Sequence, residues 1–394
     1  MSNDTQPEIR FPGFTEDWEE RKLIDLVVRL NKSTNSSRLP KVEFEDIVAG
    51  EGRLNKDVSQ KFDNRKGIEF LPNDILYGKL RPYLKNWLKA TFTGVAIGDF
   101  WVFRAKKSDS DFIYSLIQAD RYQKAANDTS GTKMPRSDWK KVSDTVFYIP
   151  NDLKEQQKIG IFFKKLDDTI ALHQRKLDLL KETKKGFLQK MFPKNGAKVP
   201  EIRFPGFTGD WEQRKLGDVL SERNDQTPET NEYPLMSFVQ GKGVTPKGER
   251  YNRSFLVKDS EKKYKKTELG DFIYSSNNLE TGSIGFNRTG KAVISPVYSI
   301  FKSKKSRESQ FIGIMSARKD FISKMVRFRQ GVVYGQWRIH ESDFLNIDTK
   351  MPNDKEQQLI ISFFENIDKT IALHQRKLDL LKETKKGFLQ KMFV

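Results

Sequence analysis

The segment TIALHQRKLDLLKETKKGFLQKMF spans Thr169–Phe192, and the same 24 residues return without a change at Thr370–Phe393. A second repeat lies upstream of each copy, where PEIRFPGFT occurs at Pro7–Thr15 and again at Pro200–Thr208. Both pairs are separated by about half of the 394-residue chain, which predicts two tandem units of similar length. The segments between the repeats are not obviously repeated, so the chain combines a constant frame with variable inserts.

The composition places limits on compartment and chemistry. The chain has no Cys and three His, namely His173, His340 and His374, so thiolate and His-rich metal sites are not expected. With 31% charged residues, no apolar run long enough to cross a membrane and no leader-like N-terminus, the sequence predicts a cytoplasmic protein without membrane contact.

The net charge of +18 favours a polyanionic partner, because Lys and Arg release the counterions condensed on phosphates. A second explanation stays open. Each 24-residue repeat carries six Lys or Arg and two Asp or Glu, so part of the excess belongs to helix surfaces.

Each 24-residue repeat is predicted to end a long helix of about 40 residues, or roughly 60 Å. Asn151 and Asp152 with Glu155, and Asn353 and Asp354 with Glu356, resemble helix starts in which a Glu bonds back to the cap. Apolar residues then recur at alternating spacings of four and three, the pattern of a coiled coil. This seam comprises Ile159, Phe163, Leu166, Ile170, His173, Leu177, Leu180, Lys184, Phe187 and Met191, and in the second copy Ile360, Phe364, Ile367, Ile371, His374, Leu378, Leu381, Lys385, Phe388 and Met392.

A seam on one helix needs a packing partner, and the simplest partner is the other copy. Two equal units related by a pseudo-two-fold axis would lay the helices antiparallel. The His and Lys positions in the seam are either register markers or contacts to another subunit, or they lie at its edge. Gly186 and Gly387 cost about 1 kcal/mol each inside a helix, which suggests close approach of another backbone there.

The two inserts, residues 22–149 and 215–351, mix short aromatic and β-branched strands with Gly, Asn and Asp turns. The predicted strand at Asn73–Tyr77 has its counterpart at Gly270–Tyr274, although the loops that follow differ. The inserts therefore resemble one α+β fold with divergent loops. Trp18 and Trp211, at matched places in the frame, are interpreted as packing residues.

The divergent loops carry side chains suited to reading DNA, since Arg and Lys pair with guanine edges and Asn and Gln with adenine. Any single one of them could instead be an ordinary polar loop residue or a phosphate contact. The candidates are Lys79, Arg81, Thr132, Lys133 and Arg136 in the first insert, and Asn277, Asn278, Thr281, Gln330, Tyr334, Gln336 and Arg338 in the second.

The chain resembles the specificity subunit of type I restriction-modification systems over essentially its whole length. The resemblance rests on the duplicated PEIRFPGFT and Asp-Trp-Glu segments, on ILYGKLRPYL at Ile75–Leu84, and on the duplicated PND, EQQ and IALHQRKLDLLKETKKGFLQKMF helices. It implies a first target recognition domain (1–149), a first long helix (150–193), a second target recognition domain (194–350) and a second long helix (351–394). The two long antiparallel helices would form a coiled coil with pseudo-two-fold symmetry.

In that family each target recognition domain reads one half of a bipartite double-stranded DNA site. The coiled coil spaces the two domains and docks two methyltransferase subunits, which methylate adenine at N6 with S-adenosylmethionine. Two restriction subunits that use ATP and Mg would translocate and cut the DNA. The resemblance implies no catalytic residue and no cofactor in this chain. Its docking surface would involve the seam residues Phe163, Ile170, His173, Leu177, Leu180, Phe187, Phe364, Ile371, His374, Leu378, Leu381 and Phe388.

The alternatives to this assignment are an enzyme and a stand-alone DNA-binding protein. A methyltransferase would need Asn- or Asp-Pro-Pro-Tyr or -Phe, and a P-loop motor Gly-x-x-x-x-Gly-Lys-Ser/Thr, and neither motif occurs. A stand-alone or orphan DNA-binding coiled-coil protein without a methyltransferase would have the same sequence features. Binding to a methyltransferase would distinguish a specificity subunit from such a stand-alone protein.

Overall fold

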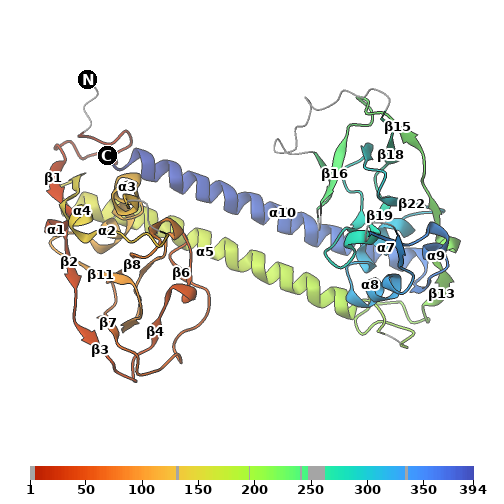
Figure 1. Cartoon of the computed structure of the whole chain (residues 1–394), viewed down its shortest axis with the longest axis horizontal. Coiled ribbons are helices and arrows are strands. Elements are labelled where there is room, and N and C mark those ends of the chain that lie inside the picture. Colours follow the sequence, from red (N-terminus) through yellow and green to blue (C-terminus); the bar gives the residue numbers. More distant parts are fainter. Residues whose placement is uncertain (1–4, 130–132, 195, 240–241, 247–261, 333–335) are drawn as a thin grey trace. The chain divides into compact units, whose positions relative to one another are not determined.

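The computed structural model describes residues 5–129, 133–194, 196–239, 242–246, 262–332 and 336–394. The chain divides into two compact units (Figure 1). The first contains the residues up to Leu177 together with His374–Val394, and the second contains Asp178–Leu373. Each unit therefore joins one insert to the beginning of one long helix and the end of the other.

The first unit is built on a four-stranded sheet of order β2-β11-β8-β9. Its strands are β2 (Val27–Leu30), β11 (Phe100–Ala105), β8 (Ile75–Gly78) and β9 (Trp87–Lys89). A second sheet has the order β3-β7-β10-β4, made by β3 (Ser33–Thr34), β7 (Gly67–Phe70), β10 (Gly94–Ala96) and β4 (Lys41–Val42). The first unit also has two separate antiparallel strand pairs, which are β1 (Glu19–Lys22) with β12 (Val146–Ile149) and β5 (Ile47–Val48) with β6 (Arg53–Leu54). The short helices are α1 (Leu23–Leu26), α2 (Ser110–Leu116), α3 (Asp120–Asn127) and α4 (Trp139–Asp144), with 3-10 turns η1 (Phe44–Asp46) and η2 (Pro82–Leu84).

The second unit repeats the main sheet of the first and varies the smaller sheets. Its main sheet has the order β14-β22-β19-β20, made by β14 (Leu220–Glu222), β22 (Ser299–Ser303), β19 (Phe272–Tyr274) and β20 (Ile284–Phe286). The other strands are β13 (Glu212–Lys215) with β25 (Asp348–Met351), β15 (Gln226–Thr227) with β18 (Tyr264–Thr267) and β21 (Ala292–Ile294), β16 (Met236–Val239) with β17 (Gly243–Pro246), and β23 (Gln330–Val332) with β24 (Gln336–Arg338). Its short helices are α6 (Leu216–Val219), α7 (Glu308–Met315), α8 (Lys319–Val326) and α9 (Glu341–Leu345), with the 3-10 turn η4 (Ser276–Asn278). The predicted duplication of one mixed α/β fold is confirmed.

The two long helices are α5 (Leu153–Lys190) and α10 (Asp354–Lys391), drawn in yellow-green and blue in Figure 1. In the first unit Phe162 packs on Phe388 and His173 on His374, so residue numbers rise along α5 as they fall along α10. In the second unit Phe187 of α5 packs on Phe363 of α10. The predicted contact between antiparallel long helices is confirmed within each unit. None of the helices in the described ranges is long and apolar enough to cross a membrane.

The phase of the seam is also as predicted. Leu177 and Leu378 are each 1% exposed, whereas the off-seam Leu179 and Leu380 are 67% and 63% exposed. Of the predicted docking residues, Phe163, Ile170, Leu177, Phe364 and Leu378 are buried, and His173, Leu180, Phe187, Ile371, His374, Leu381 and Phe388 are half-buried. Their part in docking a subunit stays a prediction.

The polar interruptions of the seam favour the interpretation as register markers. The Nδ1 atoms of His173 and His374 are 3.2 Å apart. Lys385 pairs with Asp167 at 2.6 Å in the first unit, and the repeat-related Lys184 pairs with Asp368 at 2.5 Å in the second. A shift of either helix would break these pairs.

Two expectations about the helices were wrong. A Cβ atom added at Gly186 or Gly387 would meet nothing within 4 Å, so no backbone approaches closely there.

The second expectation concerned the helix starts. The Asx caps are present, since Asp152 accepts from the amide of Lys154 at 2.7 Å and Asn353 accepts from that of Glu356 at 3.0 Å. The Glu side chains, however, do not complete capping boxes, because they bind arginines of the repeated PEIRFPGFT segments.

We call residues 7–15 the first strap and residues 200–208 the second. Arg10 of the first strap donates to both oxygens of Glu155 at 2.6 and 2.8 Å, and Trp18 donates to the same carboxylate at 3.4 Å. In the second strap Arg203 donates to both oxygens of Glu356 at 2.7 Å. The Glu side chains are each 1% exposed, so these bidentate pairs are buried at one end and fix each strap to the start of a helix.

The ends of the long helices complete the two cores. Met392 and Phe393 are buried in the core of the first unit, and Met191 and Phe192 occupy the core of the second. Trp18 and Trp211, 4% and 3% exposed, lie in the same two cores, which confirms their interpretation as packing residues. Each insert therefore needs the end of a helix that begins on the other insert.

Candidate nucleic-acid interface

In the first unit, two loops that are far apart in sequence run side by side. The chain leaves β8 at Lys79, whose carbonyl accepts from the amide of Ser137 at 2.8 Å. The amide of Arg81 then donates to the carbonyl of Pro135 at 2.7 Å, and Leu80 forms an isolated antiparallel β-bridge with Arg136. We call residues 79–85 and 133–137 the first loop pair. It brings together Lys79, Arg81, Lys133 and Arg136, the predicted contacts of this insert that fall on described residues.

Arg81 has a strained backbone. Its φ is +49° and its ψ +60°, in the left-handed region, and Pro82 follows directly. This region costs an L-residue roughly 1–2 kcal/mol, and a following proline restricts the backbone further. The hydrogen bonds of the loop pair maintain this backbone conformation, and the Arg81 side chain is exposed. Strain of this kind is typical of functional loops.

Asp99 is the counter-ion of the first loop pair. Its carboxylate is 2.8 Å from the Arg136 guanidinium and 3.7 Å from the Lys79 ammonium. The Arg136 and Lys79 side chains remain 59% and 31% exposed, so a DNA phosphate can compete with Asp99 for both. The ion pairs with Asp99 therefore position the side chains of Arg136 and Lys79.

The second unit places its candidate residues in the equivalent position. Beyond β19 the chain forms η4, where the Asn277 Oδ1 atom accepts from the amide of Trp337 at 2.6 Å. Ser276 Oγ accepts from the amide of Ile339 at 3.0 Å. We call residues 275–282 and 330–338 the second loop pair, of which residues 333–335 lie outside the described ranges. Asn278 and Thr281 are exposed on its first loop.

The ribbon of β23 and β24 groups three of the candidate side chains. Cross-strand partners are Gln330 with Arg338 and Val332 with Gln336. Because side chains alternate along a strand, Gln330, Gln336 and Arg338 project from one face of the ribbon. Gln330 donates to Asp343 of α9 at 3.5 Å, and Arg338 lies 3.6 Å from Glu341. A two-stranded ribbon of this kind fits the major groove of DNA.

The structure adds an aromatic residue that the sequence analysis did not select. Trp337 is 47% exposed, with the Arg329 guanidinium 5.6 Å from its ring centroid. Arg329 in turn donates to both oxygens of Glu280 at 2.9 and 2.8 Å, and this hydrogen bonding lowers the pKa of Glu280. Trp337 is thus a large apolar surface held among polar loops. Its position next to Gln336 and Arg338 in sequence was the available signal.

Two predicted contacts lie outside the described residues, namely Thr132 and Tyr334. Both belong to segments whose neighbours form the loop pairs. Among the residues that the structure describes, no cluster of three or more His, Asp or Glu is placed to hold a metal ion.

Comparison with known proteins agrees with the repeated fold. A family model described as "Type I restriction modification DNA specificity domain" matches residues 15–182 and again residues 208–383. The type I restriction enzyme MjaVIII specificity subunit of Methanocaldococcus jannaschii is 24% identical over 308 residues, which are 71% of this chain and 68% of that protein.

The S subunit of a type I restriction-modification system from M. genitalium has the same fold, with a TM-score of 0.65 at 12% identity, covering 99% of both chains. The HsdS subunit from Thermoanaerobacter tengcongensis matches with a TM-score of 0.43 at 17% identity, covering 96% of both chains. Since the two family matches together span most of the chain, this protein belongs to the type I restriction-modification DNA specificity family and carries two copies of its domain.

Proposed function

We propose that this chain is the DNA-reading subunit of a type I restriction-modification complex and recognises an asymmetric, interrupted site. The observation that carries the proposal is that one fold occurs twice, with its loop pairs at matching places but with different chemistry. The first loop pair presents Lys79, Arg81 and Arg136, and the second presents Asn277, Gln336 and Arg338. Two unlike readers on one chain suit two unlike half-sites better than a palindrome.

Each reader would use phosphate contacts for register and loop side chains for sequence. The half-site centres are expected about 10 bp apart, so that both readers reach grooves on one face of the duplex. The DNA between the half-sites would be touched at phosphates only.

The chain itself would do no chemistry. Two methyltransferase subunits would dock on the two copies of the long helix and methylate adenine at N6 with S-adenosylmethionine. Methylation within a duplex requires flipping the base out of the stack, so each methyltransferase must lie beside a half-site. Restriction subunits that use ATP and Mg would join this cytoplasmic complex to translocate and cut DNA.

The direct test is the adenine-methylation pattern of plasmid DNA after co-expression with the methyltransferase encoded beside this gene. We expect one interrupted motif with unlike halves and a fixed gap, methylated on both strands. A soluble complex that methylates nothing would indicate an inactive subunit. Failure to form any complex would favour a stand-alone DNA-binding protein.

Domain exchange tests the independence of the two readers. Replacing residues 22–149 with the corresponding insert of another family member should change one half-site and leave the other. A change in both halves would overturn the proposal of independent readers. In the seam, Leu177→Lys with Leu378→Lys should abolish partner assembly or alter the gap, because both side chains are 1% exposed. Unchanged assembly and gap would contradict the role of the coiled coil.

A further inference from the structure

A small hairpin in the first unit touches both the first loop pair and helix α10. It consists of β5, β6 and the turn between them. At the turn, the amide of Gly50 donates to the carbonyl of Lys85 at 2.9 Å, and Lys85 belongs to the first loop pair. The next residue, Glu51, accepts a hydrogen bond from the Lys382 ammonium of α10 at 2.8 Å.

The turn is packed closely against Tyr114 and Trp87 of the same unit. Gly52 has a φ of +65°, and a Cβ atom there would lie 1.8 Å from the Tyr114 hydroxyl oxygen and 3.4 Å from Trp87. Glu51 is only 16% exposed and also pairs with Arg53 at 2.7 Å. Burial raises the pKa of Glu51, but the hydrogen bonds from Lys382 and Arg53 outweigh it, so the net direction is downward. The carboxylate is therefore charged near neutral pH and held at both sides.

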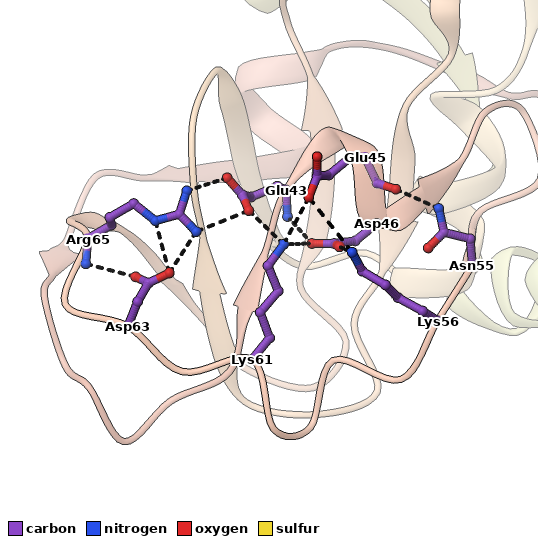
Figure 2. A network of polar contacts seen from close by, with 8 residues as sticks. All are labelled: Glu43, Glu45, Asp46, Asn55, Lys56, Lys61, Asp63 and Arg65. Carbon is purple, nitrogen blue, oxygen red and sulfur yellow. Dashed lines mark hydrogen bonds and ion pairs between the residues drawn. The ribbon is translucent and has the colours of Figure 1, made fainter.

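The base of the hairpin is held by a second set of charges (Figure 2). Asp46 is fully buried, with the ammonium groups of Lys56 and Lys61 at 2.8 and 2.7 Å from its two oxygens. The amide of Asn55 donates to the Asp46 carbonyl at 2.9 Å, and the Asn55 side chain donates to the Glu45 carbonyl at 2.5 Å. These bonds close the two ends of the hairpin onto each other.

The same network continues away from the hairpin. Lys61 also lies 2.6 Å from Glu43, which accepts from Arg65 at 2.5 and 3.1 Å, as Figure 2 shows. Arg65 donates at the same time to Asp63. Residues 43–65 thus form one cross-linked body, and its turn is bonded to Lys85 of the first loop pair and to Lys382 of α10.

We propose that the β5–β6 hairpin is a strut that fixes the first loop pair on helix α10, with Glu51 as the positioning residue at its joint. The inference rests on the proposed function, because the position of this loop pair matters if it reads DNA. The Lys382 side chain is 42% exposed, and an ion pair with one well-exposed partner contributes little to stability. Loss of the joint should therefore leave the fold intact, with Met392 and Phe393 still in the core, but let the first loop pair shift relative to α10.

The consequence for recognition concerns the gap between half-sites. A reader that is free to shift would accept sites in which the gap is one base pair too long or too short. The second unit has a different link between insert and helix, where Arg288 pairs with Asp368 at 3.0 Å. The strut is accordingly a property of the first reader, and its loss should not change the bases read by the second.

The first measurement follows the strut directly in the free protein. Because the chain has no Cys, Tyr83→Cys and Lys386→Cys place two unique spin labels on exposed positions of the first loop pair and α10. Double electron–electron resonance should give a narrow distance distribution in this labelled parent. Glu51→Lys or Lys382→Glu should broaden it, and the two together should narrow it again in part, because the exchanged pair forms while Arg53 next to position 51 keeps some repulsion. Unchanged distributions in both single variants would overturn the strut.

The matched control is Lys181→Glu, since Lys181 is the repeat copy of Lys382 in an identical stretch of sequence. It should leave the distribution narrow. Thermal melting checks folding, and all four variants should melt close to the parent.

The second measurement uses the complex with the methyltransferase and a library of sites with varied gaps. We expect each single variant to raise methylation at a gap changed by one base pair relative to the parental gap by about tenfold, because misplacement of about 1 Å alters rates strongly. The double variant should return part of the way to the parental profile. A broadened distribution with an unchanged gap profile would overturn the link to recognition. A parent that methylates no interrupted motif would contradict the proposed function, while the spin-label distances would still decide the strut.

Discussion

The amide of Ile9 donates a hydrogen bond to the carbonyl of Lys391 at 3.0 Å, which joins the beginning of the chain to its end. The repeat-related bond, from Ile202 to Lys190, has a length of 2.9 Å and spans a short connection instead. Each strap therefore sits on the end of a long helix in the same way, whether or not the chain is continuous there. The last residues of the chain are as much a part of the first unit as its own strands.

Phe393→Ala is expected to destabilise the first unit by about 3–5 kcal/mol, the usual cost of emptying a buried Phe site. Phe393 contacts Phe112 and Phe163 in that core. Hydrogen exchange should show loss of protection in β11 and retention in β22. The control is Leu380→Ala on the same helix, where the side chain is 63% exposed and the effect should be small. Equal loss of protection in both strands would contradict the assignment of Phe393 to one core.

Arg10→Met should cost about 3–5 kcal/mol, because it leaves the Glu155 carboxylate buried without its bidentate partner. Adding Glu155→Gln should recover part of the loss by removing the buried charge. Chemical denaturation measures both. Arg21→Met provides the control, since the Arg21–Glu19 pair is 46% and 35% exposed and should matter by less than about 1 kcal/mol. Similar losses of unfolding free energy for Arg10→Met and Arg21→Met would contradict a stabilising role of the buried Arg10–Glu155 pair.

Arg81→Gly should weaken DNA binding without lowering stability, because glycine adopts the left-handed backbone without strain. A lost base or phosphate contact is expected to cost about 1–3 kcal/mol of binding. Lys107 is a matched control, since it is an exposed basic residue with a φ of +53° outside the loop pairs. Lys107→Gly should give the same backbone benefit and leave affinity for the specific site nearly unchanged. Titrations at several salt concentrations and melting curves distinguish the two variants.

The His173–His374 contact should make the first unit sensitive to acid. Burial, followed by the charges of Lys377, His374 and Lys176, lowers the pKa of His173 from 6.5. The unfolded chain then binds more protons than the folded one, so this contribution is present above about pH 6.5 and is lost as the pH falls through the lower folded pKa. His173→Gln should flatten the dependence of the unfolding free energy on pH between about 7 and 5. His340→Gln, in the exposed cap of α9, should leave it unchanged.

Trp337→Ala should reduce affinity for the second half-site while leaving the melting temperature close to that of the parent. The ring is 47% exposed and its backbone amide keeps the bond to Asn277. Competition with oligonucleotides altered in one half-site at a time measures the effect. Leu269→Ala is the control, since Leu269 is also an exposed apolar residue of the second unit, at 66%. An equal loss for both half-sites would mean that Trp337 acts through the fold.

The sequence by itself determined the duplication, the two long helices, the phase of their seam and the common fold of the inserts. It could do so because identity between distant segments and the spacing of apolar residues are properties of the chain order. The candidate loops were also found in this way, since divergence between the inserts marks them. Their part in reading DNA remains a prediction.

Only the tertiary structure decided which distant residues meet. The pairing of residues 79–81 with residues 135–137, the latch from Arg10 to Glu155 and the joint from Glu51 to Lys382 connect segments whose separation follows no local period. The capping prediction for Glu155 was wrong for the same reason, because a distant guanidinium binds a carboxylate more strongly than a neighbouring amide does. Local patterns fix helices and strands, whereas charge pairs and loop contacts depend on how the folded chain brings them together.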